Sequence, residues 1–146
     1  MAPYYLDARG WGMDQAFMLI QRSPETGPPP AEELAAMKMT LNQAETTLAR
    51  LTAYQEATLR NTGKGSYQVF LRNKQTTHMH FSDLPLLQTS DPEEIQIAVQ
   101  VMEIVRSYTR AFFDKSLTGK ASPLLERSAA AGFVDGVRRF KPGKRP

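Results

Sequence analysis

The segment 67–71, Tyr-Gln-Val-Phe-Leu, and the stretch that follows it to Leu87 decide how this chain folds. Tyr67, Val69 and Leu71 alternate with the residues between them, which predicts a short β-strand. The polar, turn-prone stretch 72–77 comes next, followed by His78-Met79-His80-Phe81-Ser82-Asp83-Leu84-Pro85-Leu86-Leu87. We therefore expect His78 at the tip of a strand, with Phe81 and the leucines behind it anchored in apolar surroundings.

Strands and a long helix are predicted upstream of this segment. Tyr4–Leu6 fits a short strand, and the apolar run Ala16–Ile20, bounded by turn residues, fits a strand buried on both faces. Residues from Ala31 to about Arg60 have a helical pattern. Their apolar residues recur at alternating spacings of three and four and should form one stripe: Leu34, Met37, Leu41, Ala44, Leu48 and Leu51.

A second long helix is predicted downstream, from Asp91 to about Leu117. Asp91 can cap the first backbone N–H groups, and Pro92 needs no donor in the first turn. Its apolar face should comprise Ile95, Val99, Met102, Val105 and Phe112. The order strand, strand, helix, strand, helix fits βαβ units with parallel strands, so the sequence predicts an α/β fold. In such sheets ligands bind at the carboxyl ends of the strands.

The histidine segment resembles that of α/β-hydrolases of the platelet-activating-factor acetylhydrolase and dienelactone-hydrolase-like type. In those enzymes Phe at +3 and Asp at +5 follow the catalytic histidine, so Phe81 and Asp83 make His78 the match. The stretch Tyr4-Tyr5-Leu6-Asp7-Ala8 is similar to a strand in that family that ends in Leu-Asp-Ala, whose aspartate orients the histidine. By this resemblance Asp7 is the acid of a catalytic triad. The segment 109–120 is also similar to the terminal helix of these hydrolases.

The resemblance covers about residues 4–125 and implies only the C-terminal portion of an α/β-hydrolase fold, a short parallel sheet with two long helices. We expect residues 1–125 to form this partial domain. The basic tail 126–146, which holds Arg138, Arg139, Lys141, Lys144 and Arg145, is expected to be flexible. No platform of interleaved aromatic residues accompanies these charges, so no nucleic-acid partner is predicted.

The serine of the triad is missing from the sequence. In α/β-hydrolases it sits in Gly-x-Ser-x-Gly and precedes the acid and the histidine. No serine here has glycines at both −2 and +2, and Ser66, within Gly63-Lys64-Gly65-Ser66-Tyr67, comes nearest in composition. We therefore expect a truncated product or fragment of a carboxylic-ester hydrolase whose nucleophile lies before Met1. Full-length relatives of this type would act on small-molecule or lipid esters, whereas this chain alone should be inactive.

Other interpretations of these residues stay open. Glu25 and Asp14 are rival acids, because many α/β-hydrolases place the acid after the strand that they flank. Asp83 fits a structural role that pins the histidine loop. A His-x-His pair can bind metal only with further ligands, and only Asp83 is closely spaced, so neither a metal nor a cofactor is predicted. The alternative function is a non-catalytic α/β or helical self-association module, with a homodimer through an exposed sheet edge near Tyr4–Leu6.

The composition sets further limits. The chain has 41% hydrophobic and 23% charged residues, a net charge of +3 and no cysteine, which is typical of a soluble protein and excludes disulfides and thiolate chemistry. No apolar run has the length of a membrane span. The N-terminus lacks the basic and apolar regions of a signal peptide, so the sequence leaves the compartment open.

Overall fold

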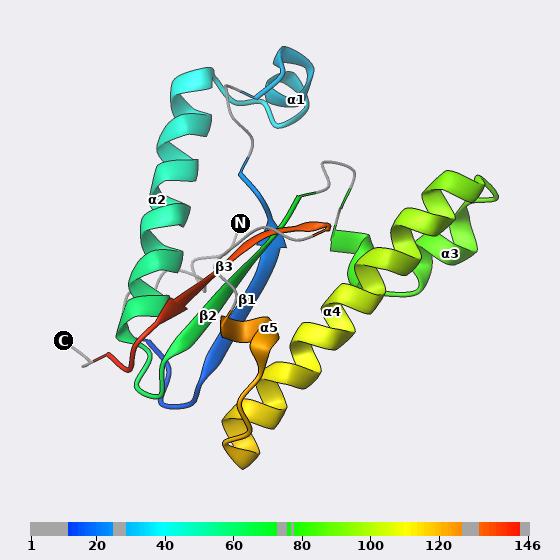
Figure 1. The fold of residues 1–146 in the computed structure, drawn as a ribbon. Coiled ribbons are helices and arrows are strands. Elements are labelled where there is room, and N and C mark those ends of the chain that lie inside the picture. The colour runs from blue at the N-terminus through cyan, green and yellow to red at the C-terminus, as the bar shows by residue number, and fades with distance from the viewer. Residues whose placement is uncertain (1–11, 25–28, 73–75, 77, 127–131, 144–146) are drawn as a thin grey trace. The chain divides into compact units, whose positions relative to one another are not determined.

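A computed structural model describes residues 12–24, 29–72, 76, 78–126 and 132–143 of the chain (Figure 1). The chain is of mixed α/β class, as predicted. Its elements in order are β1 (Phe17–Arg22), α1 (Ala31–Ala36), α2 (Leu41–Asn61), β2 (Ser66–Leu71), the 3-10 helix η2 (His78–Phe81), α3 (Leu84–Gln88), α4 (Pro92–Thr118), α5 (Pro123–Glu126) and β3 (Val134–Phe140). The strand predicted at Tyr4–Leu6 lies outside the described residues.

The three strands form one sheet in the order β1-β2-β3. The N–H of Phe17 donates to the carbonyl oxygen of Gly65 at 3.4 Å, and the N–H of Ser23 donates to that of Leu71 at 2.8 Å. The residue numbers rise together along both strands, so β1 and β2 run parallel. This pair is the βαβ unit that the sequence predicts, with α1 and α2 in the crossover.

Strand β3 makes the sheet mixed, whereas a purely parallel sheet was predicted. The N–H of Arg72, just after β2, donates to the carbonyl oxygen of Phe133, just before β3, at 2.8 Å, so β3 is antiparallel to β2. β3 lies within residues 126–146, where a flexible basic tail was expected. Val134 and Val137 are buried along this strand and account for its order, whereas the charges that suggested a tail lie at Arg138 and Arg139.

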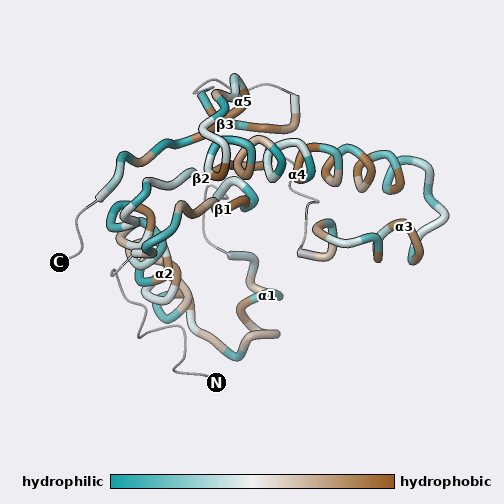
Figure 2. Tube along the Cα trace, turned by 90° about the horizontal axis from the view of Figure 1, so that it is seen from below, coloured by the Kyte–Doolittle hydropathy of each residue, from teal (hydrophilic) through white to brown (hydrophobic). Residues whose placement is uncertain are grey.

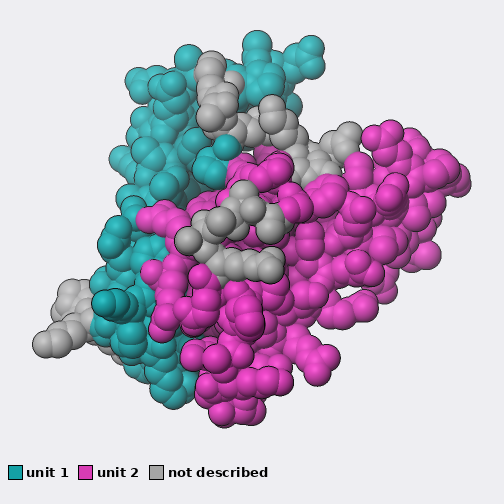
Figure 3. Space-filling view, in the orientation of Figure 1, with its two compact units in different colours: residues 1–17, 24–66, 140–146 teal, residues 18–23, 67–139 magenta. Residues whose placement is uncertain are grey.

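The chain divides into two compact units, which Figure 3 colours separately. Unit 1 comprises residues 1–17, 24–66 and 140–146, and unit 2 comprises residues 18–23 and 67–139. Most of the sheet belongs to unit 2, together with η2, α3, α4 and α5, whereas α1 and α2 belong to unit 1. Each unit combines distant parts of the sequence. The partial hydrolase domain expected over residues 1–125 stays a prediction.

In unit 1 the predicted long helix is broken into α1 and α2. Lys38 has a positive φ of 53°, which ends α1, and Thr40 starts α2 as its N-cap. The Thr40 side chain accepts a hydrogen bond from the N–H of Gln43, and the Gln43 side chain accepts one from the N–H of Thr40, which forms a capping box. This reciprocal cap starts a new helix at Leu41, although the apolar pattern continues unbroken from α1.

The apolar stripe predicted for this helix does not form a core. Leu41, Leu48 and Leu51 are exposed, and the buried residues of α2 lie near its end, at Thr58 and Leu59. There the Thr62 hydroxyl donates to the carbonyl oxygen of Thr58 at 2.8 Å. Unit 1 thus packs only the last turns of α2, and most of the stripe remains available for contact.

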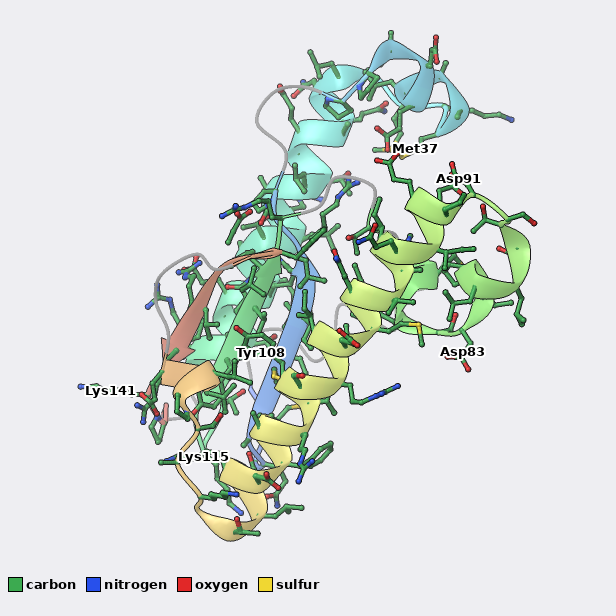
Figure 4. The ribbon with its side chains drawn as sticks, turned by 45° about the vertical axis from the view of Figure 1, so that its right-hand side comes forward. Met37, Asp83, Asp91, Tyr108, Lys115 and Lys141 are labelled. Atoms are coloured by element: carbon green, nitrogen blue, oxygen red, sulfur yellow. The ribbon has the colours of Figure 1, made fainter. Side chains whose placement is uncertain are left out.

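In unit 2, α4 begins and ends as its sequence predicts. Asp91 is the N-cap and accepts from the N–H of Glu93 at 2.9 Å, and Gly119 is the C-cap in the left-handed conformation. Asp91 and Lys115 mark the two ends of the helix in Figure 4. These caps satisfy backbone groups that the helix itself leaves unpaired.

The buried face of α4 differs from the predicted one. Its buried residues are Ala98, Val101, Tyr108, Ala111 and Phe112, whereas Val99 is exposed. Phe112 meets Tyr67 of β2 edge-to-face, with ring centroids 6.3 Å apart. Figure 2 shows apolar residues recurring along the length of α4, so a single stripe could not be chosen from spacing alone.

Gly12 in unit 1 occupies a position that only glycine fits. Its φ is +69°, and a Cβ there would lie 2.1 Å from the carbonyl oxygen of Asn61. Gly119 has a similar φ of +73°, but a Cβ there would meet nothing within 4 Å. The two glycines therefore differ in steric crowding and not in backbone conformation.

Gly12→Ala should lower the free energy of unfolding by about 3 kcal/mol or more, because left-handed strain and a backbone clash add. Gly119→Ala should cost only about 1–2 kcal/mol, from the strain alone. Urea unfolding of both variants followed by circular dichroism measures the difference. Equal losses would contradict the close packing of Gly12 on the end of α2.

Candidate functional site

The two predicted catalytic residues are described to different extents. Asp7 and its rival Glu25 lie outside the described residues. His78 is the first residue of η2, and only its backbone is described. Asp14, the other rival acid, is exposed in the bend before β1. The pairing of Asp7 with His78 therefore stays a prediction.

The histidine segment follows the carboxyl end of β2 along the chain. β1 and β2 are parallel, so their carboxyl ends, at Arg22 and Leu71, lie at the same edge. The chain leaves that edge at Arg72 and reaches η2 at His78. Thr76, within this connection, is only 3% exposed. This is the edge where α/β proteins bind their ligands.

Ser82 fixes the histidine segment locally, in the role that the sequence suggested for Asp83. The Ser82 hydroxyl donates to the carbonyl oxygen of Met79 at 2.8 Å and accepts from the N–H of Leu84 at 3.4 Å. Asp83 is the N-cap residue of α3, but its side chain makes no capping hydrogen bond. Figure 4 shows Asp83 at the turn between η2 and α3.

The apolar anchors predicted behind the histidine are not buried. Phe81 is 44% exposed, Leu84 41% and Leu87 80%. Only Pro85 and Leu86 are half-buried in this stretch. The prediction of apolar surroundings for this segment is therefore wrong for the described chain, which leaves large apolar side chains at the surface.

A groove of about 420 Å³ opens between η2 and the outer face of α4. Its apolar walls are Phe81, Met102, Val105 and Phe113, and its polar lining is His80, Ser82, Asp83, Arg106, Thr109 and Arg110. Met102 and Val105 belong to the stripe predicted as the buried face of α4. The helix therefore has two apolar faces, one packed in unit 2 and one open in this groove.

A polar cluster at the carboxyl edge of the sheet was not predicted. Asp135 of β3 accepts a hydrogen bond from the Ser23 hydroxyl and another from Nε of Arg72 at 2.7 Å. These two hydrogen bonds, with the charge of Arg72, lower the pKa of Asp135 below its ordinary value of 3.8. The cluster ties the ends of β1 and β2 to the start of β3. Because the three residues are far apart in sequence, spacing gave no signal for it.

Ser66, the serine nearest in composition to a nucleophile motif, is not available for attack. It is fully buried, and its hydroxyl donates to the carbonyl oxygen of Leu59 at 2.6 Å. A catalytic serine must instead present its oxygen at an open turn.

The described residues contain no group of three or more histidines, aspartates or glutamates that could hold a metal ion. Within the same part of the chain, none of the helices is both long and apolar enough to cross a membrane.

Comparison with known proteins gives no relative. No family model matches the chain, and neither the curated proteins nor the solved structures include a match. The function must therefore be inferred from the residues and their geometry.

The Asp135 cluster should make stability depend on pH. A carboxyl with a lowered folded-state pKa stabilises the fold above its ordinary value of 3.8, and this contribution is lost as pH falls through the lowered value. Asp135→Asn should therefore lower the urea midpoint at neutral pH and have little effect in acid. A midpoint difference that is the same at neutral and acid pH would contradict this role.

Proposed function

We propose that this chain supplies the acid and the histidine of a serine α/β-hydrolase that cleaves carboxylic esters. His78 is the base and Asp7 is the acid. The nucleophile belongs to a part that carries Gly-x-Ser-x-Gly and is not in this sequence. The chain is thus one portion of an α/β-hydrolase fold and is inactive alone.

The observation that carries this proposal is the position of His78 relative to the parallel pair β1 and β2. The histidine segment follows the carboxyl end of β2, at the edge where β1 also ends. A catalytic histidine of an α/β-hydrolase needs this location, because the nucleophile is presented at the same edge of the sheet. The match of Phe81 and Asp83 to the family pattern supports the choice of His78 over His80.

The roles follow from the chemistry of the triad. His78 takes the proton of the serine hydroxyl as the oxygen attacks the ester carbonyl, and it then gives this proton to the leaving alcohol. Water cleaves the resulting acyl-enzyme with His78 again as the base. Asp7 holds one tautomer of His78 and stabilises the imidazolium while remaining ionised. The N–H groups that bind the oxyanion come from the nucleophile's turn and from an early loop, so they too belong to the other part.

Two features of the described chain support a nucleophile that comes from another part of the fold. Ser66 is buried and hydrogen-bonded to Leu59, so it is no substitute. The groove beside η2 leaves Phe81 and Phe113 exposed, as expected for a surface that another part of a larger fold would cover. The substrate class remains a small-molecule or lipid ester.

A fluorophosphonate probe and short-chain p-nitrophenyl esters test the proposal. The isolated chain should be neither labelled nor active above its His78→Ala variant, because it has no attacking group to activate. Joining an in-frame upstream segment that contains Gly-x-Ser-x-Gly should restore both labelling and hydrolysis.

His80→Ala is the matched control, because it removes the other of the two histidines. The restored activity should survive His80→Ala and fall by about 10³-fold or more in His78→Ala, as expected for loss of a triad member. Stoichiometric labelling of the isolated chain, with turnover that depends on His78, would show that one of its own serines is the nucleophile.

A further inference from the structure

The two edges of the sheet differ in how they are protected. β3 carries Asp135, Arg138 and Arg139, and charged side chains on an edge oppose pairing with another strand. β1 has the sequence Phe-Met-Leu-Ile-Gln-Arg, with a single charge at its carboxyl end. Such an apolar run is typical of a strand that is buried on both faces. In the described chain, however, β1 is an edge strand and none of its residues is buried.

The hydrogen bonds to β2 show which backbone groups of β1 face outward. Phe17 and Ser23 donate their N–H groups to β2. Backbone groups of successive strand residues point to opposite sides, so the even-numbered residues, Met18 and Ile20 among them, direct their N–H and C=O groups to the outer edge. No described strand pairs with that edge. Within the described residues, β1 therefore has an unpaired row of backbone donors and acceptors, flanked by apolar side chains.

We propose that the outer edge of β1 binds a second copy of this chain, with the two β1 strands antiparallel about a two-fold axis. The two sheets then become one continuous sheet. Two-fold pairing is the commonest form of self-association, and a two-fold axis between identical edge strands makes them antiparallel. It also places the two Arg22 side chains at opposite ends of the interface, whereas a parallel arrangement would set them side by side.

The outward-facing residues restrict the register, and the apolar centre of β1 selects one of the registers that remain. Even-numbered residues must pair with even-numbered residues, because only these direct backbone groups to the interface. With Met18 opposite Ile20 of the partner subunit, two apolar side chains lie next to each other on one face of the sheet. The same register places Leu19 opposite the partner's Leu19 on the other face, as a non-hydrogen-bonded pair with Cα atoms about 4.5 Å apart. In this register the apolar centre of β1 pairs with itself.

This inference goes beyond the proposed hydrolase role, and its test needs no enzymatic activity. The chain has no cysteine, so single introduced cysteines report the register directly. Leu19→Cys should form an intermolecular disulfide on mild oxidation, because a separation of about 4.5 Å lies within the range of disulfides. Gln21→Cys is the matched control on the same face of β1. It lies opposite the partner's Phe17, and its two copies are about 13 Å apart along the strands.

Sedimentation equilibrium gives the independent measurement. The wild-type chain should sediment at twice its 16.4 kDa mass, and Met18→Lys should return it to the mass of one chain. Circular dichroism confirms that the variant stays folded. If Met18→Lys does not fold, the comparison of Leu19→Cys with Gln21→Cys still tests whether the two β1 strands pair. A monomeric wild-type chain, or equal cross-linking of the two cysteine variants, would overturn the proposal.

Discussion

The parallel pairing of β1 with β2 is the constraint on which the rest of the structure depends. Parallel neighbours need a crossover connection, and residues 24–65 supply it with α1 and α2. The same pairing brings the ends of both strands to one edge, where the chain continues from Arg72 toward His78. β3 then joins antiparallel to β2, and Asp135 ties Ser23 and Arg72 together at that edge. The location of the histidine segment is thus a consequence of strand direction.

Unit 2 leaves several large apolar side chains exposed at its surface. α4 packs Val101, Tyr108 and Phe112 on one side and leaves Phe113 in an open groove on another. β1 has the apolar sequence of a strand buried on both faces, but it lies at the edge of the described sheet and none of its residues is buried. We interpret both features as surfaces made for protein contact. The proposed hydrolase role would cover the groove beside η2, and the proposed pairing of two copies would cover the outer edge of β1.

Local signals in the sequence predicted elements well, whereas contacts between distant residues could not be predicted. Asp91 and Pro92 located the start of α4, because capping depends on residues within one turn, and the helix ends at Thr118, close to the predicted Leu117. The run Ala16–Ile20 located β1 for a similar reason. β3 was missed because its order depends on pairing with β2 and on burial of Val134 and Val137, while its arginines resemble a tail. The break at Lys38 was missed because an unbroken apolar pattern concealed the capping box at Thr40. Of the candidate site, the pairing of Asp7 with His78 stays a prediction, and the Asp135 cluster could not be predicted because it joins residues from separate strands.

The central claim is that Asp7 and His78 form an acid–histidine pair, and the tautomer of His78 tests it most directly. Long-range 15N–1H NMR distinguishes the two neutral tautomers, and the chain has only 2 histidines, which His80→Asn assigns. The account predicts that neutral His78 is protonated at Nδ1, donates this proton to Asp7, and loses the preference in Asp7→Asn but not in Asp14→Asn. A His78 tautomer that is unchanged in Asp7→Asn would contradict the pair.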